Sequence, residues 1–350
     1  MQFKNWLENY EFLINEIDWE GDFSDVKKQC VHPKEVAEYL NAVKANASRP
    51  YGKREKFPAN KPFVHSKSSF FNKDQEDVDI DYFIEKITAS PRTVISQTTE
   101  KIKNSGGIHQ FVYKTGIPAF RGIAYDIKNQ NFVYINTCPG AGACVAICYA
   151  RRGRYLQYPD SYDSMTRRLN LLLNNPKEYE RRLYEELENK AIKHQAIKGY
   201  KPEVILRWND SGDFFGKKYS EMSSNVIKKL QLKYNVKSYA YTKTKENPNF
   251  VQMTASDQPK GKFDFKKKTS KIVPKEIFKG LSFLKIEDEK QLKKNVAKYF
   301  SLPIDLVLTY DEMKSMPEGD SPKWHVIVTP EDGDDAAFRK DVLTILLTEH

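Results

Sequence analysis

Residues 204–214 read Val-Ile-Leu-Arg-Trp-Asn-Asp-Ser-Gly-Asp-Phe, an apolar run followed at once by polar residues. The apolar run predicts a buried strand, and the Asn, Asp, Ser and Gly residues predict the loop that ends it. In parallel α/β folds, ligands bind at the carboxyl ends of the strands. We therefore expect the polar side chains of this loop on the ligand-binding face: Asn209, Asp210, Ser211 and Asp213.

Strand and helix patterns alternate on both sides of this run, which predicts parallel strands joined by helices. We interpret residues 109–350 as an α/β core with a partial or full parallel (β/α) barrel-like architecture; an open sheet is the alternative. The predicted strands are 111–113, 122–128, 131–136, 204–208, 236–242, 250–254, 281–286, 304–309 and 324–329, and the predicted helices are 161–174, 176–194, 219–234, 288–300 and 335–347.

The segment before the core has a different pattern. Residues 1–50 carry apolar residues at helical spacing, most clearly over residues 34–46, and predict a helical N-terminal extension. Residues 51–108 begin with a stretch rich in Pro, Lys, Asn and Ser and predict a linker followed by a helix within 81–103.

Composition limits the class of protein. The chain has 350 residues, 39% of them hydrophobic, which is enough for a packed globular core. No apolar stretch is long enough to span a membrane, and the N-terminus lacks the apolar run of a signal peptide, so we expect a cytoplasmic protein without a membrane partner. The formal net charge of +10 favours a polyanionic partner, such as a nucleic acid or nucleotide.

Three of the four cysteines fall in the segment 136–155, at Cys138, Cys144 and Cys148. In a reducing compartment, such a cluster is more typical of metal binding than of disulfides. Zinc sites usually have four protein ligands, and no matching fourth ligand is evident in the sequence. Three thiolates suit an iron–sulfur cluster with one open iron. A zinc site, and small buried cysteines beside a Gly-rich turn, remain alternatives.

A resemblance to a known family rests on two motifs. Cys138-Pro-Gly-Ala is followed by Cys144 and by Cys148-Tyr-Ala-Arg-Arg-Gly-Arg-Tyr, and later by Asn209-Asp-Ser-Gly-Asp-Phe. Together they resemble the bacteriophage family named for gene product 88 of mycobacteriophages, from about Cys138 to Thr244. A weaker similarity begins near Gly333-Asp-Asp. The resemblance implies a phage-encoded protein that works in the host cytoplasm.

The sequence Cys148-Tyr-Ala-Arg is also similar to segments of radical S-adenosylmethionine enzymes. In those enzymes a barrel binds a four-iron cluster through three cysteines, and an apolar or aromatic residue, here Ile147, precedes the last one. The intervals of five and then three residues between the cysteines differ from the usual three and then two. This resemblance implies an iron–sulfur cluster and S-adenosylmethionine as cofactors.

The loop 209–213 and the cysteine segment 136–155 supply the remaining candidate residues. Asp210, Asp213 and Lys243, which follows the predicted strand 236–242, are candidate catalytic residues. Asn209, Ser211 and Tyr149 are candidates for cofactor binding. Arginine favours bidentate contacts with phosphate, and three arginines that follow the last cysteine are candidates for nucleic-acid binding: Arg151, Arg152 and Arg154.

Three functional hypotheses follow. The first is an iron–sulfur, radical S-adenosylmethionine-like enzyme that acts on a nucleotide or nucleic acid. The second is a zinc-containing nucleic-acid-binding protein of replication or host takeover. The third is a Mg²⁺-dependent nuclease that uses Asp210 and Asp213.

Overall fold

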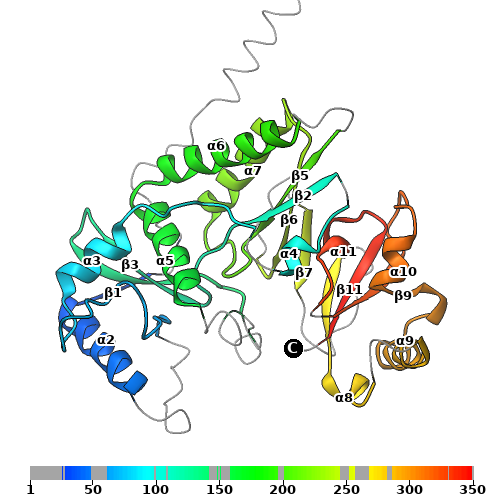
Figure 1. The fold of residues 1–350 in the computed structure, drawn as a ribbon, viewed down its shortest axis with the longest axis horizontal. Coiled ribbons are helices and arrows are strands. Elements are labelled where there is room, and N and C mark those ends of the chain that lie inside the picture. The colour runs from blue at the N-terminus through cyan, green and yellow to red at the C-terminus, as the bar shows by residue number, and fades with distance from the viewer. Residues whose placement is uncertain are drawn as a thin grey trace, which may run out of the picture.

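The fold was determined as a computed structural model (Figure 1). It describes residues 26, 28–48, 61–97, 100–107, 109–141, 148, 150, 158–195, 201–244, 252–256, 268–281, 286–329 and 331–348. No helix in these ranges is long and apolar enough to cross a lipid bilayer.

The core is an eight-stranded sheet in which every neighbouring pair of strands is parallel. This confirms the parallel α/β class. The strands, in spatial order, are β2 (Gln110–Lys114), β5 (Glu203–Trp208), β6 (Val236–Thr242), β7 (Gln252–Ser256), β8 (Thr269–Val273), β11 (Val342–Thr348), β10 (Trp324–Val328) and β9 (Val307–Thr309).

A closed barrel is not formed by the described strands, because β2 and β9 occupy opposite edges of the sheet. The sheet is nevertheless curved, since side chains from β2, β5 and β6 share one hydrophobic cluster with side chains from β9, β10 and β11. Short helices fill the concave side between these strands and keep the two edges apart: α4 (Glu100–Lys103), α10 (Tyr310–Ser315) and α11 (Asp335–Phe338).

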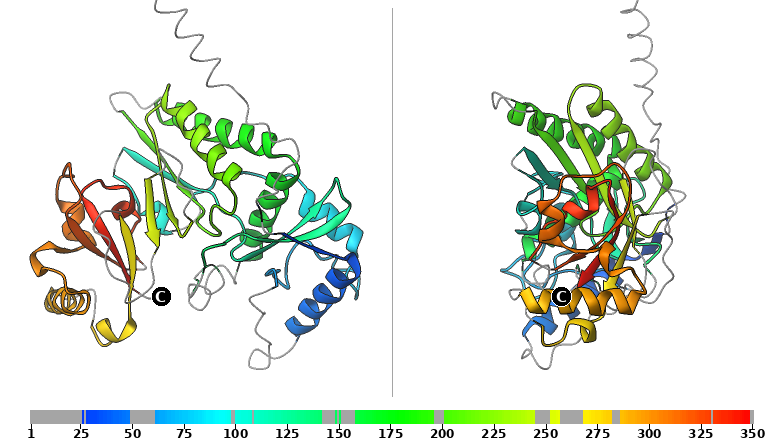
Figure 2. Two further views of the ribbon diagram at one scale, coloured as in Figure 1. Left: turned by 180° about the vertical axis from the view of Figure 1, so that it is seen from behind. Right: turned by 90° about the vertical axis from the view of Figure 1, so that its right-hand side faces the viewer.

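The convex side of the sheet is covered by longer helices (Figures 1 and 2). Helices α6 (Pro176–Gln195) and α7 (Lys217–Gln231) pack on β2, β5 and β6, where Leu183, Leu206 and Ile227 belong to the largest hydrophobic cluster. Helix α9 (Ile286–Phe300) covers the other half of the sheet. Helix α8 (Lys275–Phe278) and the 3-10 helix Ile304–Leu306 lie beside α9.

A second, antiparallel sheet precedes the site. It has the order β1 (Lys28–Val31), β4 (Asn131–Asn136) and β3 (Arg121–Asp126), and it packs against α2 (Pro33–Ser48), α3 (Ile80–Thr88) and α5 (Pro159–Asn174). The predicted strands 122–128 and 131–136 are confirmed as β3 and β4, which form a hairpin through a turn over residues 127–130, and β4 leads directly toward Cys138.

Several local predictions can be compared with these elements. The predicted helix 176–194 is confirmed as α6, and the Asn175 side chain caps it by accepting a hydrogen bond from the Glu178 backbone N–H at 3.1 Å. The predicted final helix over 335–347 is wrong: only Asp335–Phe338 is helical, and Val342–Thr348 forms β11. The apolar run of β11 is buried between β8 and β10, where a central strand is apolar on both faces. Residues 1–25 and most of the predicted strand 281–286 lie outside the described residues.

Candidate functional site

The loop after β5, residues 209–213, is built against the chain that leaves β2. The Asp210 N–H donates to the Thr115 carbonyl at 2.9 Å, and the Ile117 N–H donates to the Ser211 carbonyl at 3.0 Å. Gly212 has φ +81°, and a Cβ there would lie 2.5 Å from the Ile117 side chain, so only glycine fits. The loop is therefore fixed in place by the neighbouring strand end.

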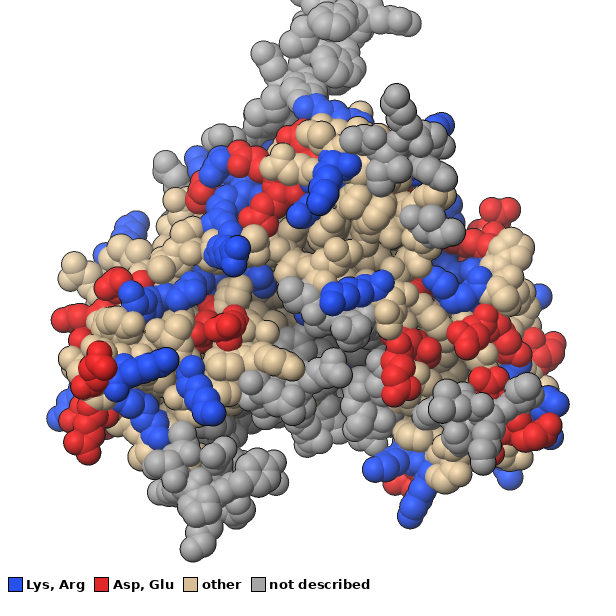
Figure 3. Space-filling view, in the orientation of Figure 1, with Lys and Arg blue, Asp and Glu red and all other residues tan. Residues whose placement is uncertain are grey.

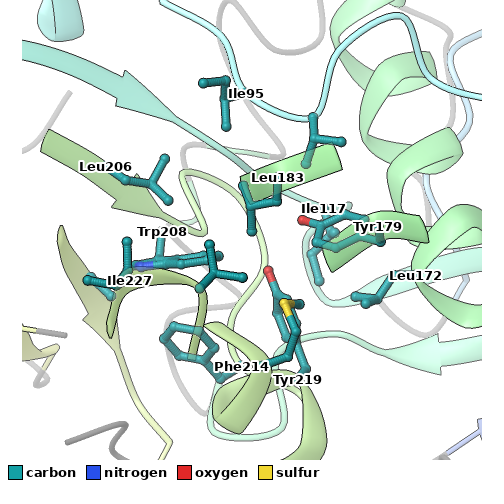
Figure 4. Packing of buried hydrophobic residues seen from close by; sticks show 14 of the residues in the cluster. Ile95, Ile117, Leu172, Tyr179, Leu183, Leu206, Trp208, Phe214, Tyr219 and Ile227 are labelled. Atoms are coloured by element: carbon teal, nitrogen blue, oxygen red, sulfur yellow. The ribbon is translucent and has the colours of Figure 1, made fainter. Parts of the chain in front are cut away.

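Asn209 makes the turn out of the strand. It adopts φ +50°, a left-handed conformation that Asn tolerates better than most residues, and its Oδ1 accepts a hydrogen bond from the Tyr219 hydroxyl at 2.9 Å. The aromatic rings of Trp208, Phe214 and Tyr219 pack together beneath the loop (Figure 4). This aromatic packing gives the polar loop a rigid floor.

Asp213 joins the ends of β5 and β6. Its Oδ1 accepts hydrogen bonds from the Thr242 hydroxyl at 2.5 Å and the Phe214 N–H at 2.8 Å, and its Oδ2 accepts one from the Lys243 N–H at 2.9 Å. Burial raises the pKa of Asp213, and these hydrogen bonds together with the Lys243 charge work in the opposite direction. Thr242 and Lys243, at the end of β6, thus meet this loop at Asp213.

Asp210 faces a different set of partners. Its carboxylate forms an ion pair with Lys114, the last residue of β2, and lies 3.5 Å from a guanidinium nitrogen of Arg207 on β5. Burial lowers the pKa of Arg168 on α5, and the nearby charge of Asp210 works in the opposite direction. Asp210 and Asp213 are both buried, and the hydrogen bonds of Asp213 to Thr242, Phe214 and Lys243 differ from the ion pairs of Asp210 with Lys114 and Arg207.

The charge network continues to the far end of the chain. Arg207 forms an ion pair with Asp334, and the Tyr239 hydroxyl donates to the same Asp334 oxygen at 2.9 Å. Arg207 also lies over the ring of Tyr241, 5.4 Å from its centroid. The sequence patterns did not single out Lys114, Arg207, Tyr239 or Asp334 as functional residues. A charged residue at the end of each apolar strand was the available signal for Lys114 and Arg207.

The cysteine segment begins beside the same strand ends. The Thr137 carbonyl accepts a hydrogen bond from the Asp213 N–H at 2.8 Å, and the Phe120 N–H donates to the Cys138 Sγ at 3.3 Å. Gly140 lies so close to the backbone after β6 that a Cβ on it would be 2.6 Å from the Lys243 carbonyl oxygen. The start of the cysteine segment therefore lies next to the loop 209–213 and the end of β6.

Two of the three clustered cysteines can be placed. Cys148 is buried in a small cluster with Ala119, Phe120 and Ala150, and Cys138 packs against that cluster. Within the described residues, no group of three or more His, Cys, Asp or Glu side chains is arranged to hold a metal ion. The remaining candidates of this segment lie outside the described residues: Cys144, Tyr149, Arg151, Arg152 and Arg154.

The other predicted cofactor-binding side chains lie in the loop itself. Asn209 and Ser211 are buried, and the Asn209 Nδ2 and the Ser211 hydroxyl have no hydrogen-bond partner among the described residues. Buried polar atoms are nearly always hydrogen-bonded in folded proteins, to protein, water or ligand. These two atoms are therefore available to a polar group that enters the loop.

A comparison with protein families gives a match over this part of the chain. Residues 93–260 match the family model of gene product 88. The match supports the resemblance to that phage family, and it spans β2 to β7, the loop 209–213 and the cysteine segment. Asp334 lies outside it. No curated protein and no solved structure matches the chain.

Proposed function

We propose that this chain is an iron–sulfur protein whose cluster is held by Cys138, Cys144 and Cys148 above the carboxyl ends of β5 and β6. The observation that carries the proposal is the contact between the cysteine segment and the ends of β5 and β6. The Asp213 N–H bonds to Thr137 next to Cys138, and Gly140 abuts Lys243. A cluster on these cysteines would lie beside the strand-end loop, where α/β proteins bind their ligands.

The donor set fits an iron–sulfur cluster better than zinc. Cys138 and Cys148 share a mostly apolar environment, which suits thiolate ligation of a cluster shielded from water. A closed zinc site needs a fourth ligand. Within the described part of the chain, His194 stacks on Phe111 and contacts the Tyr113 hydroxyl, and His325 is buried on β10, so neither joins a metal-binding group with the cysteines.

The residues around the loop would position a second ligand. When bound, the cluster would supply single electrons to a cofactor of the S-adenosylmethionine class, as the resemblance of Cys148-Tyr-Ala-Arg to radical S-adenosylmethionine enzymes implies. Asp213 keeps the ends of β5 and β6 at a fixed separation, through its bonds to Thr242 and Lys243. The Asn209 Nδ2 is a donor, and the Ser211 hydroxyl is a donor and an acceptor, for the polar groups of such a ligand.

The geometry gives less support to a Mg²⁺-dependent nuclease. Such a site needs carboxylates that converge on one ion. Here Asp213 already accepts three hydrogen bonds, whereas Asp210 is paired with Lys114 and Arg207. We retain a nucleotide or nucleic acid as the proposed substrate class. On the face shown in Figure 3, Lys and Arg are interspersed with Asp and Glu. The charges of that face therefore give this substrate class no further support.

Chemical analysis of anaerobically purified protein tests the proposal. We expect a brown protein with visible absorbance and with iron and acid-labile sulfide in comparable amounts per chain. Zinc bound in a one-to-one ratio without iron would contradict the cluster and favour the second hypothesis, a zinc-containing nucleic-acid-binding protein. In that case nucleic-acid affinity should fall steeply as salt rises, because phosphate contacts release counterions.

A further inference from the structure

Asp334 reaches the strand-end network from a distant part of the chain. It precedes α11 on the concave side of the sheet and is almost completely buried, with 1% of its surface exposed. Its carboxylate forms the ion pair with Arg207 and accepts the Tyr239 hydrogen bond, and its backbone N–H donates to the Ser105 hydroxyl at 2.6 Å. The segment that carries it therefore contacts β5, β6 and the approach to β2.

The neighbouring residues explain why this segment stays in place. Asp335 bonds to Lys314 at 2.7 Å and to the Gly106 N–H at 2.9 Å, and it also accepts a hydrogen bond from the Tyr310 hydroxyl. A Cβ on Gly333 would be 2.8 Å from the Asn104 carbonyl oxygen, so the close approach requires glycine. Asp335 anchors the segment to α10 and the β2 side, while Asp334 points to Arg207.

Four charges are linked in series in this interior: Lys114, Asp210, Arg207 and Asp334. Each is at least nine-tenths buried. Breaking one pair in such an interior leaves an uncompensated buried charge, which then draws on the remaining partners. Without the Asp334 charge, Arg207 would shift toward Asp210, the other carboxylate of this series, and the hold of Lys114 on Asp210 would weaken.

We infer that Asp334 is a positioning residue for the strand-end site, which fixes Asp210 through Arg207. The inference deepens the proposed function, because the site is the one where the second ligand is proposed to bind. It also means that the site is completed by a residue outside the family match at 93–260.

The first test is spectroscopic and uses the full chain labelled with 13Cγ-aspartate, with the Asp210 signal assigned from Asp210→Asn. The variant Asp334→Asn keeps the shape of the side chain and removes its charge. We expect it to shift the Asp210 signal, and Asp334→Glu, which keeps the charge, to restore the signal toward its wild-type position. Asp335→Asn is the matched control: it removes another buried carboxylate, next in sequence, and the Asp210 signal should stay in place.

The second test is a double-mutant cycle on the unfolding equilibrium in urea. Combining Asp210→Asn with Asp334→Asn leaves Arg207 without either carboxylate. The unfolding equilibrium constant should then rise more than the product of the two single effects, by a factor within the roughly 2- to 150-fold range of coupled neighbours. Combining Asp210→Asn with Asp335→Asn should give the simple product.

An Asp210 signal that does not move in Asp334→Asn overturns the inference. So does a signal that moves equally in Asp335→Asn, because both variants would then report a general loss of packing. If Asp334→Asn does not fold, Tyr239→Phe removes the second contact of Asp334 and should shift the same signal less; no shift there has the same negative meaning. None of these readouts depends on iron, so the inference and the proposed cluster can fail separately.

Discussion

The Asp213 carboxylate illustrates how single residues build this site. Three donors from two strand ends converge on one buried carboxylate, and its own backbone N–H holds the start of the cysteine segment. A buried carboxylate is costly unless donors surround it. The hydrogen bonds of Asp213 are therefore needed both to stabilise its charge and to set the distance between β5 and β6.

Replacing Asp213 with Asn should destabilise the protein by about 1–3 kcal/mol, the usual cost of leaving a buried donor unsatisfied. The amide has only one acceptor oxygen, so either the Lys243 N–H or the Phe214 N–H loses its acceptor. Urea unfolding measures the difference. Asp126→Asn is the control, because Asp126 accepts from Asn129 at an exposed turn, and its change should stay within about 0.5 kcal/mol. Equal effects at both positions would contradict the role given to Asp213.

At the scale of elements, the hairpin β3–β4 delivers the cysteine segment to the ends of β5 and β6. The close fit of Gly140 against Lys243 fixes that delivery, since the nearest atoms are the carbonyl group and the Cβ of Lys243, which cannot move aside without the backbone. The position of Cys138 thus depends on a glycine two residues away.

Gly140→Ala should therefore destabilise the protein by about 1–3 kcal/mol, the typical cost of overpacking, and lower the iron content per chain. Gly107→Ala is the matched control, because its added Cβ meets only the Gln110 side chain at an ordinary 3.7 Å. Iron analysis and urea unfolding of the two variants decide the point. A Gly140→Ala protein as stable and as iron-rich as the control would show that the contact between Gly140 and Lys243 does not position the cysteine segment.

The elements also show how far sequence reasoning could reach. The hairpin, the buried strand 204–208 and the polar loop after it were predictable because each has a local pattern of its own. The pairing of β11 was not, since an apolar run of that length suits a buried helix as well as a central strand. The Asp334–Arg207 pair was also beyond reach, because it depends on how the sheet curves, and curvature leaves no local signal in the sequence.

At the scale of the whole molecule, one buried histidine should make stability depend on pH. Burial lowers the pKa of His325 on β10 to about 4, against an ordinary value near 6.5 in the unfolded chain. Between these pH values the unfolded chain binds the proton and the native protein does not. Above about pH 6.5 the histidine is neutral in both states and does not lower the free energy of unfolding. As the pH falls from 6.5 toward 4, the unfolded chain gains the proton and the free energy of unfolding decreases.

The loss should reach about 3 kcal/mol, because each unit of difference in pKa corresponds to about 1.4 kcal/mol. The measurement is the free energy of unfolding at several pH values for wild type and His325→Leu. We expect the wild type to lose stability between pH 6.5 and 4 and the variant to lack that part of the loss. Parallel curves for the two proteins would contradict the assignment.

The central claim is that the clustered cysteines bind iron beside the strand ends, and a matched pair of cysteine variants tests it most directly. Cys148 is buried in the cluster that Cys138 joins, whereas Cys30 is exposed on β1. The measurement is iron and sulfide per chain, with the visible spectrum, after identical anaerobic purification of Cys148→Ala and Cys30→Ala. We predict that Cys30→Ala keeps the iron, the sulfide and the brown colour of the wild type, and that Cys148→Ala loses them. Equal iron in the two variants, or a wild-type protein that holds zinc alone, would contradict the claim.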